Sequence, residues 1–272
     1  MKTHIFYNAT LIKPCQIDYE GGFIDKKYTL IHTRFPYFSE LNRNLNHKAI
    51  VCMSMGDNGL EIKNNNYYIG TAYLPHLLFK EFNPNIFKLF TYHSCINHPN
   101  IIGVPCGTMT TDGYNQNYQN LKTAIDLNIP KTKLLYLKFT GHNHHIRPNL
   151  INLYINKKWA TVENPEEGLI YFKKMKQHKF VLCPRGNGPD SYRVWEALLL
   201  GCIPIVSSQE IGGCHHYFKD LPILQVKNWN LTEQYLENVW LDWSRKEWNW
   251  NMLYEKYWID LINREHKCLL QQ

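Results

Sequence analysis

Short apolar runs, separated by turns or by segments of helix length, follow one another through the first half of the chain. Strands that alternate with connectors of helix length predict a mainly parallel α/β sheet. Residues 70–82 fit both the helical and the strand period, so their structure is left open. The predicted strands are residues 26–35, 47–59 (ending in the turn sequence Gly-Asp-Asn-Gly), 85–95 and 100–108, and the connector of helix length is 114–128.

The same alternation restarts near Lys131, which predicts a second unit. We therefore divide the chain into residues 1–130 and residues 131–272. In the second unit we expect a strand that turns at Gly141, helices after Pro148 and over 164–178, a strand–loop–helix–strand segment over 179–208, and one or two amphipathic helices over 232–266.

The composition fits a globular protein with an anionic partner. The 272 residues are 44% hydrophobic and 19% charged, so one large domain or two ordinary domains can fold without disulfides. A net charge of +7 suits nucleic acid, an anionic membrane surface or a phosphorylated small molecule. The aromatic content of 14% fits either an aromatic-rich core or a surface that grips sugars or bases.

The eight cysteines indicate a reducing compartment. They form no Cys-x-x-Cys pair, and several lie in apolar runs, which is typical of buried thiols rather than of a disulfide framework or a zinc site. The amino-terminal residues contain no continuous apolar stretch, and no run approaches the roughly 20 apolar residues of a membrane span. We therefore expect a soluble, cytoplasmic protein without a membrane span.

The loop between the strand and the helix of 179–208 has the features of an anion site. Gly186 and Gly188 let backbone N–H groups approach a ligand, and the helix that follows, roughly 191–200, points its positive end at the same place. Arg185 and Arg193 add charge that suits a diphosphate. The alternative is a tight turn in which Asp190 or Ser191 caps the helix.

Glu196 is a carboxylate in an otherwise apolar run of this helix. A buried carboxylate costs free energy unless something binds it. Arg193 lies three residues earlier, on the same helical face, and could form an ion pair with it. The other interpretation is that Glu196 accepts hydrogen bonds from two vicinal hydroxyls of a ligand, such as those of a ribose.

A second glycine-containing loop precedes a helix upstream. The strand that begins near Lys131 ends at Thr140 and Gly141, and Arg147 would lie near the start of the next helix, where it could neutralise phosphate. Histidines 142, 144 and 145 are close together, but no further ligand type is evident, so we predict no metal site. A divalent metal stays open, although none is required.

The segment 135–210 resembles the carboxyl-terminal half of the exostosin-like glycosyltransferases. The resemblance rests on Phe, Cys-Pro-Arg-Gly, Asp-Ser-x-Arg, Glu and Gly-Cys-x-Pro in KFVLCPRGNGPDSYRVWEALLLGCIPIV, with YLKFTGHNHHIRPNL upstream. It implies a GT-B fold, with two Rossmann-like domains facing across a cleft and carboxyl-terminal helices crossing back to the first. The donor, a UDP-sugar, would bind the second domain, and a glycan or glycoprotein acceptor the first, with inversion of configuration.

On this resemblance the donor-binding residues are Thr140, Gly141, Arg147, Arg185, Gly186, Asn187, Gly188, Asp190, Ser191, Arg193, Glu196 and Glu210. The chain departs from the family in being short and in lacking an amino-terminal membrane anchor. Both departures suggest a compact microbial or viral relative, for which the giant-virus enzymes of this family are one candidate group. In that case UDP-xylose is a reasonable donor, and the enzyme is a hexosyl- or pentosyltransferase.

An inverting transferase needs a base for the acceptor hydroxyl, and the base should come from the first domain. Asp57 ends a predicted strand and is one candidate, although an aspartate in this position also forms turns. His93 is the second candidate. The arginines and the helix start can stabilise the leaving diphosphate without a metal. The tryptophans of the carboxyl-terminal segment either stack on glycans or pack at helical spacing; they are Trp240, Trp243, Trp248, Trp250 and Trp258.

Three other functions keep parts of the same pattern. A sugar-nucleotide enzyme that hydrolyses or epimerises its substrate would share the anion loop. A catalytically inactive glycan-binding protein would bind sugar but not UDP. A nucleic-acid-binding module would explain the net charge, but its basic residues should be interleaved with aromatics along one surface. The basic residues of 179–208 instead converge on one helix start, so we expect no nucleic-acid partner.

Overall fold

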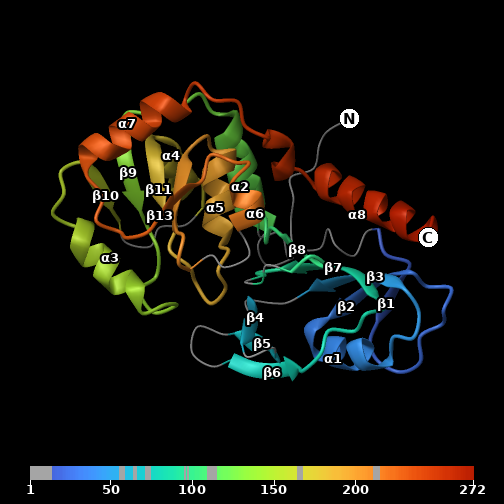
Figure 1. Ribbon diagram of the computed structural model, residues 1–272. Helices are drawn as coiled ribbons and strands as arrows, with labels where there is room; N and C mark the ends of the chain where they lie inside the picture. Colours follow the sequence, from blue (N-terminus) through green and yellow to red (C-terminus); the bar gives the residue numbers. More distant parts are fainter. Residues whose placement is uncertain are drawn as a thin grey trace.

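The computed structural model describes residues 14–54, 59–63, 66–70, 75–94, 96, 98–108, 115–163, 168–210 and 215–272. Two five-stranded parallel sheets dominate it (Figure 1). The first sheet is built from the first 104 residues, and the second from residues 133–226.

The first sheet has the strand order β1-β2-β3-β7-β8, and every pairing in it is parallel. The predicted strand 26–35 is shorter than expected, because Arg34 ends it and Pro36 sits in the first turn of α1. The elements are β1 (Ile17–Tyr19), β2 (Leu30–Arg34), α1 (Phe35–Asn44), β3 (Ala49–Ser54), β7 (Ile86–Tyr92) and β8 (Ile101–Val104).

A small antiparallel sheet is inserted between β3 and β7. It consists of β4 (Gly59–Lys63), β5 (Asn66–Gly70) and β6 (Pro75–Phe79). The segment 70–82, whose period was ambiguous, therefore contains a strand.

The second sheet has the order β10-β9-β11-β12-β13 and is again parallel throughout. Its predicted strand–loop–helix–strand segment is present as β11, α5 and β12. The strands are β9 (Lys133–Leu137), β10 (Ala160–Val162), β11 (His178–Leu182), β12 (Ile203–Ser207) and β13 (Leu224–Val226). The helices are α2 (Asn115–Asp126), α3 (Ile146–Tyr154), α4 (Gly168–Lys176), α5 (Tyr192–Leu199), α6 (His215–Phe218), α7 (Glu233–Trp243), the 3₁₀ turn η4 (Trp250–Leu253) and α8 (Glu255–Leu270).

Each sheet is covered on both faces, as parallel sheets require. Helix α1 packs on one face of the first sheet through Phe38 and Leu41, and α3 and α7 pack on one face of the second through Leu150 and Leu236. The remaining faces share one continuous core, which contains residues of α2, α4, α5 and α8.

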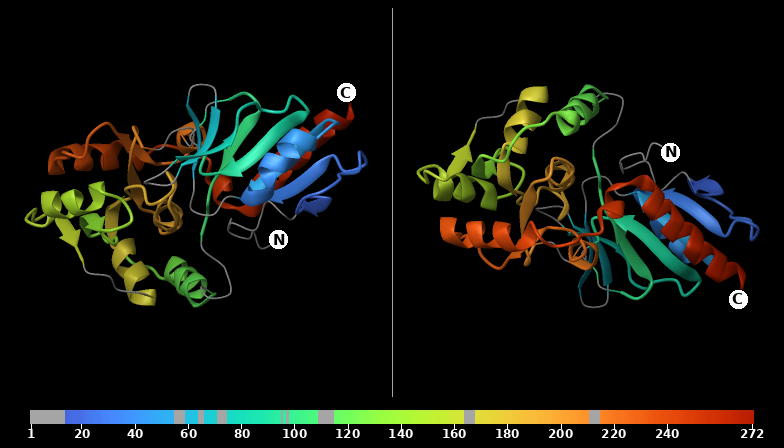
Figure 2. Two further views of the ribbon diagram at one scale, coloured as in Figure 1. Left: turned by 90° about the horizontal axis from the view of Figure 1, so that it is seen from below. Right: turned by 90° about the horizontal axis from the view of Figure 1, so that it is seen from above.

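The last helix, α8, leaves the second sheet and returns to the first (Figure 2). Trp258 and Ile262 of α8 are buried in the same cluster as Leu30 and Phe90 of the first sheet. The hydroxyl of Thr29 and Nε2 of His266 are 2.9 Å apart. The tryptophan Trp258 therefore packs in the core, as one of the two interpretations of the tryptophan-rich segment expected.

Candidate functional site

A cavity of about 860 Å³ lies where the carboxyl ends of the strands meet. The first sheet contributes His93, directly after β7, and the second contributes the segments that follow β9 and β11. The starts of α2, α4 and α5 complete the wall. In open α/β folds, ligands bind at this edge of the sheet.

The glycine loop after β11 packs closely against its neighbours. A Cβ on Gly188 would lie 2.6 Å from Nδ1 of His93, and a Cβ on Gly186 would lie 3.1 Å from Nη2 of Arg147. Gly188 therefore has room for no side chain while the His93 ring keeps its place. His93 itself has a positive φ of 51°, which is uncommon for a residue other than glycine.

The start of α5 leaves polar groups ready for an anion. Ser191 occupies the N-cap position, but its side chain makes no capping hydrogen bond. The Oγ atom of Ser191 and Nε of Arg193 are buried and have no hydrogen-bond partner among the described residues. Buried donors without partners are costly, and they stand here beside the positive end of a helix. The arrangement favours a bound phosphate oxygen.

The guanidinium of Arg147 donates hydrogen bonds to three backbone carbonyl oxygens. They belong to Arg185 at 3.0 Å, Thr140 at 3.2 Å and Pro184 at 3.3 Å. Burial lowers the pKa of Arg147 to about 10, so the group keeps its charge at neutral pH. Arg147 thus joins the two loops that form the cavity wall, and it adds positive charge there.

Phe139 supports both cavity arginines. Its ring centroid lies 5.6 Å from Cζ of Arg147 and 5.7 Å from Cζ of Arg193. Cation–π contacts of this kind stabilise buried guanidinium groups. Phe139 holds the two like charges at one wall of the cavity, a role that the sequence analysis did not assign.

Glu196 is held by a tyrosine from the neighbouring helix. The hydroxyl of Tyr171 on α4 donates to Oε2 of Glu196 at 2.9 Å. Burial raises the pKa of Glu196, whereas Arg193, Tyr171 and Lys138 lower it. The ammonium group of Lys138 lies 4.1 Å above the Tyr171 ring. Among the described residues, no ion pair within 4 Å joins Glu196 to Arg193, so the contact of its carboxylate with the protein is the Tyr171 hydroxyl. Arg193 and Lys138 act as nearby charges. Glu196 also lines the cavity, which leaves the interpretation as a hydroxyl-binding residue open.

Asp190 anchors the loop to the first half of the chain. Its carboxylate accepts from the backbone N–H of Cys106 at 2.9 Å, from the Trp195 indole at 2.9 and 3.1 Å, and from the Tyr217 hydroxyl at 3.3 Å. Burial raises the pKa of Asp190 to about 6, while these hydrogen bonds act in the opposite direction. Asp190 lines the cavity, but its oxygens are bound to protein donors.

The structure brings together most of the predicted residues. His93, Thr140, Arg147, Gly186, Asn187, Gly188, Asp190, Ser191, Arg193 and Glu196 line the cavity. Gly141, Arg185 and Glu210 are not part of its wall. Burial raises the pKa of Glu210, and the charge of Arg185 lowers it. Asp57 lies outside the described residues.

Several cavity residues had not been predicted. They are Gln116, Asn117, Asn120, Lys138, Phe139, Asn143, Gly168, Tyr171 and Tyr192. Lys138 and Phe139 follow β9 directly, and their position at a strand end was a signal that the sequence offered.

The histidine-rich loop holds two rings in contact. Among the described residues, no group of three His, Cys, Asp or Glu side chains is placed to hold an ion. Burial, with Arg185 nearby, lowers the pKa of His144 to about 4. The His144 and His145 rings instead contact each other in a tilted arrangement, with centroids 4.3 Å apart and an interplanar angle of 36°.

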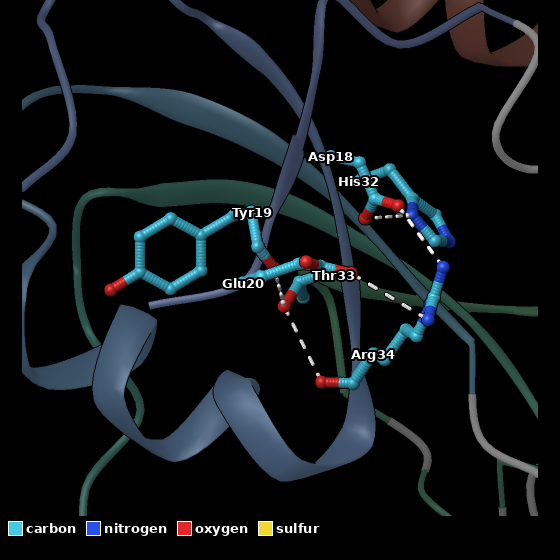
Figure 3. A network of polar contacts seen from close by, with 6 residues as sticks. All are labelled: Asp18, Tyr19, Glu20, His32, Thr33 and Arg34. Carbon is cyan, nitrogen blue, oxygen red and sulfur yellow. Dashed lines mark hydrogen bonds and ion pairs between the residues drawn. The ribbon is translucent and has the colours of Figure 1, made fainter. Parts of the chain in front are cut away.

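A separate polar network lies on the first sheet, away from the cavity wall (Figure 3). His32 is fully buried and its Nδ1 is 2.8 Å from Oδ1 of Asp18 on the edge strand β1. Arg34 lies 3.4 Å from Asp18 and 3.6 Å from Glu20. Burial lowers the pKa of His32, so its imidazole is neutral at pH 7. This network ties β1 to β2.

Fold and site together define a class of protein. Two parallel sheets meet at a polar cavity, and the last helix returns from the second sheet to the first, which confirms the predicted GT-B architecture. In the part of the chain that the structure describes, no helix combines the length and the apolar character needed to cross a bilayer.

Comparison with known proteins supports the predicted resemblance. Residues 111–230, just under half of the chain, match the exostosin GT47 domain, in agreement with the resemblance to exostosin-like glycosyltransferases. A probable glycosyltransferase of Arabidopsis thaliana is 28% identical over 207 residues, which cover 74% of this chain and 37% of the relative. The chain thus spans little more than a third of that relative's length.

Two solved structures also match at low similarity. The GtfA/B complex is 10% identical with a TM-score of 0.36, over 89% of this chain and 56% of that one. The pneumococcal O-GlcNAc transferase GtfA in complex with UDP and GlcNAc is 10% identical with a TM-score of 0.39, over 92% of this chain and 58% of that one.

Proposed function

We propose that the protein is an inverting glycosyltransferase that moves a sugar from a UDP-sugar, such as UDP-xylose, to a hydroxyl of a glycan or glycoprotein. The observation that carries the proposal is the start of α5. Ser191 Oγ and Arg193 Nε are buried without partners among the described residues, beside a helix start and two glycines that line the cavity. A diphosphate supplies the acceptor oxygens that this arrangement lacks. The family match supports transfer as the reaction.

In the proposed reaction the acceptor oxygen attacks C1 of the donor sugar. The C1–O bond to the diphosphate breaks, and its electron pair leaves with the diphosphate oxygen. The hydroxyl proton passes to the imidazole of His93, which lies at the first-sheet side of the cavity against Gly188. Arg193 and the α5 N–H groups stabilise the charge of the leaving group. This charge balance needs no metal, although it does not exclude one.

The same geometry assigns acceptor binding and donor binding to different parts of the chain. Residues of the first sheet, with His93 at their edge, are assigned to the acceptor, and the loops of the second sheet to the donor. Helix α2 is counted with the donor-binding part, because it packs against α4 of the second unit. We further propose that the protein acts in the cytoplasm, since four of its described free cysteines are buried thiols.

A ligand-binding series tests the proposal. Thermal unfolding is measured with UDP, CDP and GDP for wild type, Arg193→Lys and the control Arg264→Met, whose arginine is 69% exposed. UDP at about 100 times its Kd adds about 2.7 kcal/mol of stability. For a chain of this size the melting temperature then rises by roughly 5–10 °C. Arg193→Lys should lose most of that rise and Arg264→Met none.

A second assay separates transfer from the alternatives. UDP release from UDP-xylose and UDP-glucose is followed with and without a simple glycoside acceptor. Release that depends on the acceptor supports transfer, and release without an acceptor supports a hydrolase. Binding of glycans without any binding of nucleotides would support the non-catalytic alternative, and stabilisation by no nucleotide overturns the proposal.

A further inference from the structure

One end of the cavity is lined by carboxamides that the proposed reaction does not use. Gln116, Asn117 and Asn120 lie in the first turns of α2 and all line the cavity. Residues three and four apart share one face of a helix, so the three amides stand together. Nε2 of Gln116 donates to Oδ1 of Asn120 at 3.3 Å.

Asn120 is fixed by its neighbour on α4. Gly168 begins this helix with a φ of +72°, and a Cβ on it would lie 3.3 Å from Nδ2 of Asn120. The carboxamide therefore packs against the α4 backbone. Because Gln116 donates to its oxygen, Asn120 offers a ligand its N–H groups, which suit a carbonyl oxygen.

The cavity wall has an order that can be followed through contacts. His93 meets Gly188, and α5 begins three residues after that glycine at its Ser191 cap. Glu196 lies five residues further along α5, roughly 7.5 Å at the rise of an α-helix. Glu196 meets Tyr171 of α4. The first residue of α4, Gly168, meets Asn120 of α2.

A nucleotide sugar has the same order of groups. The transferred sugar belongs at His93, the diphosphate at the start of α5 and the ribose at Glu196. The next group of the ligand is the nucleobase, and the next part of the wall is the amide end. We propose that Gln116, Asn117 and Asn120 form a nucleobase subsite that selects uracil. This inference rests on the proposed function and extends it to the choice of nucleotide.

The expected selectivity comes from one pair of atoms. Uracil presents a carbonyl oxygen at C4, which accepts from Nδ2 of Asn120. Cytosine has an amino group there, so two donors would face each other. A mismatched buried hydrogen bond costs about 1–3 kcal/mol, which corresponds to roughly 5- to 150-fold in affinity. An aspartate at position 120 accepts only, and it should reverse the preference.

The test uses calorimetric binding of UDP, CDP and ribose 5-diphosphate to the full chain. Wild type should bind UDP about 10-fold or more tightly than CDP and than ribose 5-diphosphate. Asn120→Asp should shift the ratio of UDP to CDP affinity by about 10-fold or more towards CDP. Gln119→Glu is the matched control, because it makes the same chemical change on an exposed residue of α2 that does not line the cavity.

Each outcome decides one question. If ribose 5-diphosphate binds as tightly as UDP, or if Asn120→Asp leaves the affinity ratio within about twofold of wild type, the subsite is wrong while the proposed function stands. If wild type binds none of the three ligands, the proposed function fails. Should Asn120→Asp not fold, the exposed Gln116→Ala replaces it. Loss of its hydrogen bond to Asn120 should lower the preference for UDP about threefold or more, and an unchanged preference overturns the subsite.

Discussion

Replacing Asp190 by asparagine should change how the stability of the protein depends on pH. In the folded protein burial raises the pKa of Asp190 from 3.8 to about 6. Between these two values the folded state holds a proton that the unfolded chain has released. Stability therefore falls as the pH rises through this window, and the cost is complete above pH 6. Asparagine cannot titrate, so the variant lacks this part of the pH dependence.

The size of the effect follows from the same shift. At about 1.4 kcal/mol for each pH unit, the gap between 3.8 and about 6 corresponds to about 3 kcal/mol. As the pH falls from 7 to 4, the unfolding free energy of wild type should rise relative to Asp190→Asn by up to this amount. The other carboxylates titrate in both proteins, so their contributions cancel in the difference.

Urea unfolding, followed by tryptophan fluorescence at half-unit steps between pH 4 and pH 7.5, measures this difference. Asp242→Asn is the control, because Asp242 is exposed at the end of α7 and its ion pair among the described residues is with the exposed Lys246, just beyond the helix. Its difference from wild type should stay within a few tenths of a kcal/mol across the range. A constant difference for Asp190→Asn, or a loss of wild-type stability relative to the variant on acidification, would refute the reasoning.

Two further substitutions probe the cavity wall. Gly188→Ala places a methyl group 2.6 Å from Nδ1 of His93, so the unfolding free energy should fall by about 1–3 kcal/mol and turnover of the donor by about 100-fold. Gly141→Ala is its control, because the added methyl group would lie 3.7 Å from its nearest neighbour. In urea unfolding this control should cost no more than about 0.5 kcal/mol. Arg147→Lys cannot reproduce three hydrogen bonds to backbone carbonyls, so the unfolding free energy should fall by about 2–4 kcal/mol, and equal stability would contradict a clamping role.

Local pattern was sufficient for much of the fold. The alternation of apolar runs with helix-length connectors predicted β3, β7, β8, β9, β11 and β12 and the α5 helix, because parallel strands buried on both faces are continuous apolar runs. Helix α1 was missed because no element was predicted between the strand that ends at residue 35 and the strand that begins at residue 47. Pro36, in the first turn of α1, was the available signal.

Site residues that are close together in the sequence could be predicted, whereas contacts between residues far apart in the sequence could not. The start of α5 follows the glycine loop directly and carries Ser191, Arg193 and Glu196. Their position together at the cavity could therefore be expected from the sequence. Asp190 is bound by Cys106, 84 residues away in sequence, and spacing carries no information on such a pair. The carboxamides of α2 had the polar character of a solvent-exposed helix face, and only tertiary packing places them in the cavity.

The return of α8 to the first sheet constrains how the cavity can open. The chain passes between the two sheets twice, once between Val104 and Asn115 and once between Trp243 and Glu255. Each crossing limits how far one sheet can move from the other. Sliding of one sheet past the other would require α8 to leave the core around Trp258, which would expose the apolar surface that both sheets now share.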